Sequence, residues 1–89
     1  MAKRTLIIIN KLGLHARAAA RFVQTASAFE CEIQVVYGNK QINGKSIMGV
    51  MMLAAGNGAS IDIIVSGRDE NAALDKLEEL ILNRFGEHE

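Results

Sequence analysis

Two segments of the chain alternate apolar and polar residues, and this alternation limits the possible folds more than any other feature. Successive side chains of a β-strand point to opposite faces, so each segment predicts a strand with one buried face. The apolar residues occupy every second position of segments 32–37 and 60–66: Ile33, Val35, Tyr37, Ile61, Ile63 and Val65. A sheet built from such strands needs a cover on its apolar face alone.

Two segments with helical periodicity are predicted to cover the apolar face of the sheet. Apolar residues recur three or four positions apart in segment 16–28 and again near the end of the chain: Ala19, Phe22, Val23 and Ala26, then Ala73, Leu74, Leu77, Ile81 and Phe85. We expect Asp69 to cap the last helix and Gly86 to end it. Ser46 predicts the start of a further, brief helix over residues 47–53.

The remaining segments complete the order of elements. Residues 5–10 are rich in β-branched side chains and predict a first strand. Residues 38–40 predict a hairpin turn, and residues 40–43 its short return strand. The resulting order, βαββαβα, predicts an open-faced sheet with the helices packed on one side.

Length and composition favour one globular domain, residues 1–89, because hydrophobic residues make up 49% of the chain and can close a single core. The single cysteine, Cys31, excludes an intramolecular disulfide and favours a reducing compartment. The early apolar run 6–9 is too short for a signal peptide or a membrane span, so we expect a cytoplasmic protein without membrane insertion. The net charge of zero argues against a nucleic-acid partner.

Charge is distributed unevenly along the chain. Residues 1–29 contain cations and no acid: Lys3, Arg4, Lys11, Arg17 and Arg21. From Asp69 onward, acids outnumber cations. Either chance and a solvated acidic helix explain this pattern, or the N-terminal cations surround a site for an anion.

His15 lies where the glycine-containing loop 10–14 ends and the first helix begins. The first backbone N–H groups of a helix have no partner within it, and the helix dipole adds partial positive charge there. Ala16, Arg17 and Ala18 therefore predict a backbone cradle for an anion, and the Arg17 side chain adds donors suited to phosphate oxygens. The same field favours a neutral imidazole, which is a nucleophile. These features together predict that His15 can carry a phosphoryl group.

Other interpretations of His15 remain open on these grounds. A histidine near a helix start is also typical of an ordinary surface residue or an indifferent cap. A metal site is disfavoured because Cys31 and His88 are the other candidate soft ligands. No acid lies near His15 in the sequence for general acid–base catalysis, and no glycine-rich phosphate loop is present. We expect neither a metal nor a cofactor.

Three motifs carry a family resemblance. They are residues 13–22 (GLHARAAARF), residues 43–50 (NGKSIMGV) and residues 66–74 (SGRDENAAL), correctly ordered and spaced over nearly the whole chain. They resemble the HPr family, the histidine-containing phosphocarriers of the phosphoenolpyruvate-dependent phosphotransferase system. The resemblance implies an α+β open-faced β-sandwich, with a four-stranded antiparallel sheet and three helices on one face. One departure is Ala18, where the family usually has proline.

The resemblance also implies a function. His15 would be phosphorylated transiently at Nδ1 by enzyme I and would pass the phosphoryl group to EIIA-type proteins. The protein would then be a substrate of enzymes and not an enzyme itself. Ser46 on its own is an ordinary N-cap, but its neighbours resemble those of the regulatory serine that HPr kinase/phosphorylase modifies.

Segment 47–53 carries more apolar side chains than one face of a short helix can bury. We assign Val50 and Leu53 to the core. The predicted docking surface for partners comprises Ile47, Met48 and Met51 with the cations Arg21 and Lys45. Burial of all the apolar residues in the core is the alternative.

Two further functional hypotheses fit parts of the sequence. A carrier of the nitrogen-related regulatory branch shares the histidine motif, which does not separate it from a carrier for sugar transport. A small ferredoxin-like RNA-binding module would need exposed strand aromatics and a basic face, but Tyr37 is the one strand aromatic and the net charge is zero. We expect a monomer that binds no nucleic acid.

Overall fold

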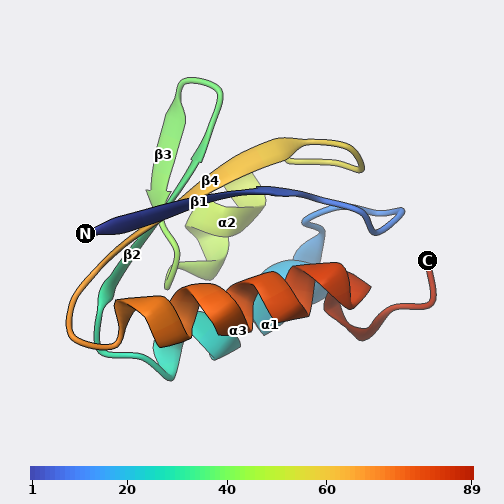
Figure 1. Ribbon diagram of the computed structural model, residues 1–89. Coiled ribbons are helices and arrows are strands. Elements are labelled where there is room, and N and C mark those ends of the chain that lie inside the picture. Colours follow the sequence, from blue (N-terminus) through green and yellow to red (C-terminus); the bar gives the residue numbers. More distant parts are fainter.

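In the computed structural model, which describes residues 1–89, three helices cover one face of a four-stranded sheet (Figure 1). The strands are β1 (Ala2–Ile7), β2 (Glu32–Tyr37), β3 (Lys40–Asn43) and β4 (Ser60–Ser66). The helices are α1 (Ala16–Ser27), α2 (Ile47–Met52) and α3 (Glu70–Leu82), followed by a 3₁₀ turn, η1 (Arg84–Gly86). The predicted α+β class and the order of elements are confirmed.

The strand order in the sheet is β1-β4-β2-β3, and every neighbouring pair is antiparallel. The central strand β4 places Ile61 opposite Leu6 of β1 and Val65 opposite Ile33 of β2. The bounds of β2, β3 and β4 agree with the prediction. Their register is strongly specified, because a slip by one residue would turn the apolar row to solvent.

The first strand begins at Ala2 and ends at Ile7, so the predicted range of 5–10 is wrong at both ends. β1 pairs with residues 60–65 of β4, and Ile8 adds backbone hydrogen bonds to Gly58 and Ala59 just before β4. Ile8 and Asn10 then turn inward and have no exposed surface. The β-branched run at the end of the predicted strand therefore belongs partly to the loop before α1.

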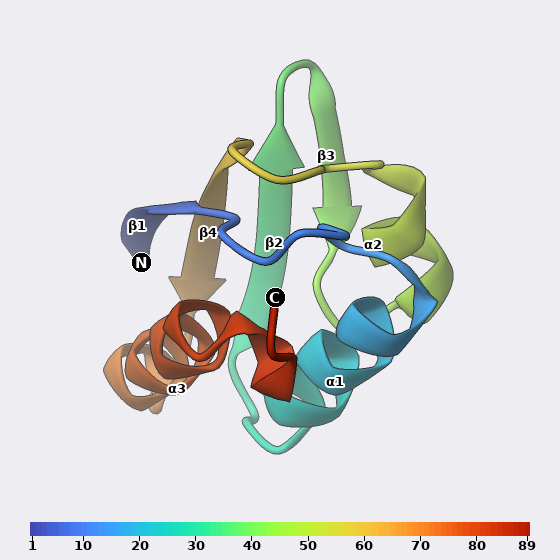
Figure 2. The ribbon, with the colours of Figure 1, turned by 90° about the vertical axis from the view of Figure 1, so that its right-hand side faces the viewer.

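The core lies between the sheet and the helices α1 and α3, which run side by side (Figure 2). Phe22 of α1 and Leu77 and Ile81 of α3 have at most 1% of their surface exposed. The predicted apolar stripes of both helices are confirmed, with Val23 half-buried. Cys31 is buried as predicted, and burial raises the pKa of its thiol. None of the helices has the length and hydropathy of a membrane-spanning segment.

Asp69 stands at the N-cap position of α3 but does not cap the helix, so this prediction is wrong. Its carboxylate accepts hydrogen bonds from the backbone N–H groups of Glu30 at 2.9 Å and Cys31 at 3.0 Å. The bond from Glu30 is the main reason why the pKa of Asp69 lies below its ordinary value. Asp69 therefore ties the start of α3 to the segment that enters β2.

The helix α3 ends at Leu82, before the predicted end at Gly86. A left-handed turn at Arg84 and Phe85, with φ of 55° and 56°, then reverses the chain. Phe85 is fully buried at this turn. The last residues are thereby directed back toward the loop that precedes α1 (Figure 2).

Candidate functional site

The loop before α1 sets the position of His15. Gly13 has a φ of +66°, and a Cβ at this residue would lie 2.6 Å from the carbonyl oxygen of Ala55. The N–H of buried Leu14 donates to the same carbonyl oxygen at 2.9 Å. Glycine at position 13 therefore lets the loop pack against the connection between α2 and β4. His15 follows directly, as the last residue before the helix.

His15 lies at the N-cap of α1 in an extended conformation (φ −73°, ψ −179°). Its carbonyl oxygen accepts the first helical hydrogen bond, from the N–H of Ala19 at 2.8 Å, whereas its ring makes no capping bond. The side chain is 28% exposed. The predicted placement of a histidine ring at the positive end of a helix is thus confirmed.

Fewer residues are exposed in the first turn of α1 than the predicted cradle requires. Ala16 and Arg17 are exposed, so their N–H groups can face a ligand at the start of the helix. Ala18 has no exposed surface, because its side of the first turn packs into the core. Its N–H is closed to a ligand in this conformation, which corrects its assignment to the cradle.

A carboxylate lies against His15, although the sequence suggested no acid near this residue. Oε2 of Glu87 and Nε2 of the His15 ring form a hydrogen bond. The left-handed turn after α3 brings the two residues together across 72 positions of sequence. No local pattern reports a contact over that separation. His15 therefore has an acidic partner in the folded chain, although no acid lies near it in the sequence.

The second carboxylate oxygen of Glu87 is also bound. Nδ2 of Asn10 donates to Oε1 at 3.0 Å and to the carbonyl oxygen of Gly13 at 2.9 Å. The Glu87 side chain is 13% exposed, and burial alone would raise its pKa. The bonds from Asn10 and His15 and the nearby charge of Arg17 outweigh burial, so the pKa of Glu87 lies below its ordinary value. Glu87 is therefore ionised at neutral pH.

Two of the N-terminal cations form ion pairs with acids from the C-terminal part of the chain. Arg4 of β1 binds Asp75 of α3 at 3.0 Å, and Lys11 of the loop binds Glu89 at 3.1 Å. Arg17 is exposed next to the His15 ring. Arg17 and Lys11 are the N-terminal cations that line the hollow around His15.

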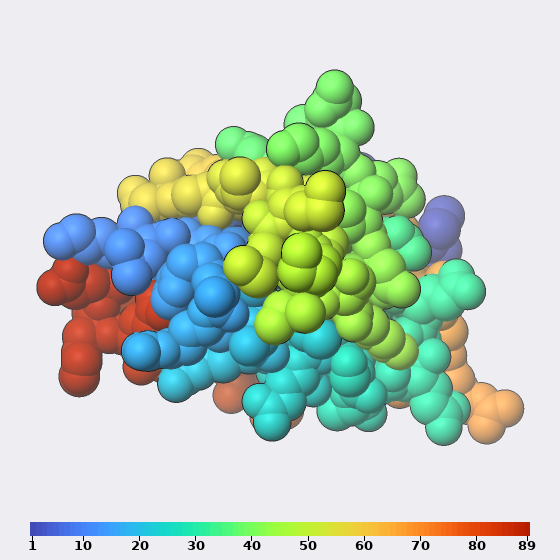
Figure 3. Space-filling view, turned by 180° about the vertical axis from the view of Figure 1, so that it is seen from behind, coloured from blue at the N-terminus to red at the C-terminus, as the bar shows by residue number.

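An open hollow surrounds the His15 ring. His15, Ala16 and Arg17 line one side of it, and Glu87, His88 and Glu89 line the other. In Figure 3, the red atoms of the C-terminal segment lie against the blue atoms of the loop and the first turn of α1. His88, the second histidine of the chain, therefore belongs to the surroundings of His15.

Four side chains of α2 form an exposed apolar patch, called here the α2 patch: Ile47, Met48, Met51 and Met52, which are 38–66% exposed. Val50 and Leu53 have at most 1% of their surface exposed. The predicted division of this helix into core and surface is confirmed, with Met52 as an addition. The yellow-green atoms of α2 adjoin the lighter blue atoms of α1 in Figure 3, so α2 packs beside the helix that begins after His15.

Three polar residues of the predicted docking surface and regulatory site make contacts within the chain. Arg21 donates from Nη1 to the carbonyl oxygen of Phe85, and Lys45 donates from Nζ to that of Phe29 at 2.6 Å. Each of these side chains therefore has a partner within the chain. The Oγ of Ser46 accepts a hydrogen bond from the N–H of Gly49 at 3.1 Å, which confirms the predicted N-cap.

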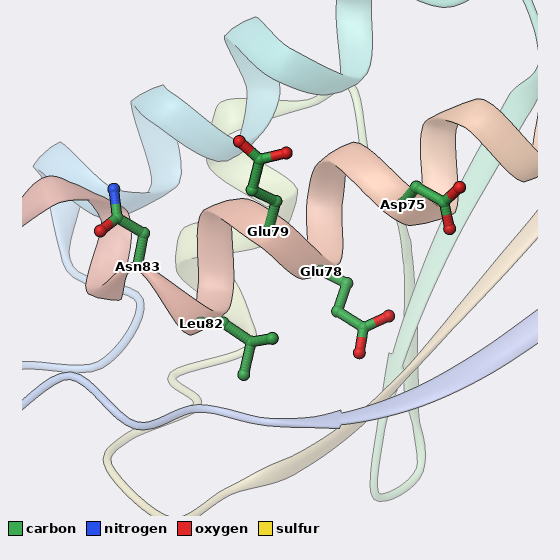
Figure 4. A pocket seen from close by; sticks show the side chains of 5 residues that line it. All are labelled: Asp75, Glu78, Glu79, Leu82 and Asn83. Atoms are coloured by element: carbon green, nitrogen blue, oxygen red, sulfur yellow. The ribbon is translucent and has the colours of Figure 1, made fainter.

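A second hollow lies on the outer side of α3 and has a different character (Figure 4). Its lining residues are Asp75, Glu78, Glu79, Leu82 and Asn83. Asp75 and Glu78 already bind Arg4. No histidine, cysteine or serine lines this hollow. It is part of the acidic, solvated face that the sequence predicts for the last helix.

Known proteins match the chain over nearly its whole length. The family described as "PTS HPr component phosphorylation site" matches residues 2–83. Phosphocarrier protein HPr of Neisseria meningitidis serogroup A is 52% identical over 89 residues, 100% of both chains. The crystal structure of HPr from Thermoanaerobacter tengcongensis has a TM-score of 0.96 at 47% identity and covers 100% of both chains. A structure of an HPr dimer from the same organism has a TM-score of 0.79 at 48% identity, covering 98% of this chain and 100% of that one.

The fold and the histidine presented at a helix start define a small carrier of phosphoryl groups. The chain belongs to the HPr family, the phosphocarriers of the phosphotransferase system. It is a phosphoryl carrier and not an enzyme. This assignment replaces the hypothesis of a ferredoxin-like binding module. The expected monomer stays a prediction, since a dimer occurs among the related structures.

Proposed function

We propose that His15 accepts a phosphoryl group at Nδ1 from enzyme I and passes it to EIIA-type proteins. The observation that carries this proposal is the position of the ring at the N-terminus of α1, 28% exposed and beside Arg17. The N–H groups of Ala16 and Arg17 and the helix dipole favour an anion there. The Arg17 guanidinium adds charge-assisted hydrogen bonds to the phosphate oxygens.

Mass spectrometry of the intact protein tests this proposal. Wild type and His15→Ala are incubated with phosphoenolpyruvate and enzyme I, and we expect one acid-labile phosphate on the wild type and none on the variant. His88→Ala removes the other histidine of the hollow and is the matched control, which should still be phosphorylated. Phosphate on His15→Ala, or none on the wild type with any cognate enzyme I, would contradict the proposal.

The α2 patch would form the apolar centre of the docking surface for both partners. It belongs to α2, which packs beside α1, the helix that begins after His15, and methionine side chains adapt to more than one partner. Arg21 and Lys45 would add positive charge at its edge and favour a partner with an acidic rim. Met48→Asp should therefore weaken binding to enzyme I. Leu82→Asp, which changes a similarly exposed residue on α3, should leave binding unaltered.

Ser46 would be a regulatory site for HPr kinase/phosphorylase. It begins α2 and immediately precedes Ile47 and Met48 of the α2 patch. A phosphate is compatible with the N-terminus of a helix, so modification should not unfold α2. It would instead place a charge of about −1.5 to −2 beside apolar contact residues. Partners that dock on the α2 patch would then bind more weakly.

A further inference from the structure

The contact between His15 and Glu87 determines which ring nitrogen carries the hydrogen. An ionised carboxylate can only accept hydrogen bonds, so the shared hydrogen belongs to Nε2 of His15. In a neutral imidazole, one nitrogen carries the hydrogen and the other carries the free lone pair. With the hydrogen on Nε2, the lone pair is on Nδ1, which is the nitrogen that a phosphoryl group would then meet.

One contact holds the Glu87 carboxylate, and another holds the backbone turn that precedes Glu87. From the loop, Asn10 donates to Oε1, and Asn10 itself has no exposed surface and is fixed by the carbonyl oxygen of Gly13. From the C-terminal turn, Phe85 is fully buried and its carbonyl oxygen accepts a hydrogen bond from Arg21. The side chain of Glu87 is accordingly 13% exposed, although it lies near the end of the chain. Glu87, the hydrogen-bond partner of the His15 ring, is therefore itself held in a fixed position.

This contact is compatible with phosphoryl transfer because the two ring nitrogens have separate tasks. The lone pair of Nδ1 forms the bond to phosphorus while the bond from phosphorus to the donor atom breaks, and that electron pair stays on the donor. The hydrogen remains on Nε2, so the ring becomes positively charged. The hydrogen bond to the carboxylate strengthens as this charge develops. When the phosphoryl group moves on, the electron pair of the N–P bond returns to Nδ1 and the ring becomes neutral again.

We propose that Glu87 is a positioning residue for His15. It keeps the hydrogen on Nε2, leaves the lone pair of Nδ1 free for the phosphoryl group, and stabilises the positive charge that the phosphorylated ring gains. Glu87 acts through the ring and does not touch the phosphoryl group. A carboxylate that holds a histidine ring in one tautomer has the same task in the serine hydrolase triad. The proposal rests on the proposed phosphorylation of His15.

NMR of the ring nitrogens in the full-length, ¹⁵N-labelled protein tests the positioning directly. Spectra of wild type, Glu87→Gln and Glu87→Ala are compared at a pH where the ring is neutral. Glu79→Gln is the matched control, because its carboxylate pairs with Lys76 on α3 and does not line the hollow around His15. We expect the hydrogen on Nε2 in wild type and Glu79→Gln, and both tautomers in Glu87→Ala. Glu87→Gln should keep the hydrogen on Nε2, since the amide oxygen can still accept it.

Transfer kinetics separate the orientation of the ring from the effect of the charge. Glu87→Gln keeps the acceptor but loses the charge, so its rate of phosphoryl transfer should fall roughly ten- to hundredfold. The rate of Glu87→Ala should fall further, and Glu79→Gln should match the wild type.

A hydrogen on Nδ1 in the wild type would overturn the proposal. So would ring signals or transfer rates in Glu87→Ala that equal those of the wild type. The ring spectra decide the positioning even if the wild type accepts no phosphoryl group. Failure of this proposal and failure of the proposed function can therefore be told apart.

Discussion

Replacement of Gly13 by alanine tests whether the loop before α1 sets the position of His15. Gly13 has a φ of +66°, and an alanine in this left-handed region costs about 1–2 kcal/mol. The added Cβ would also lie 2.6 Å from the carbonyl oxygen of Ala55 and 2.6 Å from Cα of Gly56, so backbone must move. Such overpacking adds about 1–3 kcal/mol. The total loss of roughly 2–5 kcal/mol should lower Tm by at least about 8 °C in a domain of this size.

Gly38→Ala is the matched control for this experiment. Gly38 has a φ of +62°, but no atom lies within 4 Å of an added Cβ, so only the conformational cost of about 1–2 kcal/mol applies. Thermal denaturation followed by circular dichroism gives Tm for both variants, and the enzyme I assay gives their transfer rates. Gly13→Ala should be the less stable and the slower, whereas Gly38→Ala should transfer at the wild-type rate. Equal destabilisation, or unaltered transfer by Gly13→Ala, would refute the positional role of the loop.

Three further predictions concern the site, its regulation and the pH dependence of stability. Arg17→Ala should lose about 1.5–3 kcal/mol of transition-state stabilisation, seen as slower transfer in rapid-quench kinetics, with unchanged Tm because the side chain is exposed. Equal transfer rates in Arg17→Ala and the wild type would show that Arg17 does not stabilise the phosphoryl group. Ser46→Asp should weaken binding to enzyme I in calorimetry, whereas Ser66→Asp at the end of β4 should not. The pKa of Asp69 is lowered in the folded state. Ionised Asp69 therefore contributes to the free energy of unfolding above its unfolded pKa of about 3.9. This contribution is lost as pH falls through the folded-state pKa. The free energies of unfolding of wild type and Asp69→Asn should therefore differ most at neutral pH and converge below about pH 4. A difference that is independent of pH would contradict this.

Strict periodicity explains why some elements were predicted well. Apolar residues alternate in β2 and β4, and the turn at Gly38 determines where β3 begins, so the bounds of these strands follow from local sequence. The apolar positions of α1 and α3 follow equally from their spacing. β1 is an edge strand in which Lys3, Arg4 and Thr5 interrupt the apolar pattern, and its bounds come from pairing with β4. Pairing partners distant in sequence are not visible in a local pattern.

The same limit explains what was missed at the site. The sequence motif located His15 and Arg17, but the partner of the ring comes from the opposite end of the chain. Its position depends on Arg84 and Phe85, two consecutive residues in the left-handed conformation. Non-glycine residues rarely adopt this conformation, so the sequence does not predict it here. The carboxylate of Asp69 likewise binds N–H groups from a different segment. Polar contacts over long sequence separations are thus the features that the structure adds.

Identification of the ring nitrogen that bonds to phosphorus is the most direct test of the proposed phosphoryl transfer. The ¹⁵N-labelled protein can be phosphorylated with phosphoenolpyruvate and enzyme I, and the ring spectra then locate both the phosphorus coupling and the remaining hydrogen. We predict phosphorus coupling to Nδ1 of His15, with the hydrogen retained on Nε2. Coupling to Nε2, or a phosphoryl group on any residue other than His15, would contradict both the proposed site and the positioning role of Glu87.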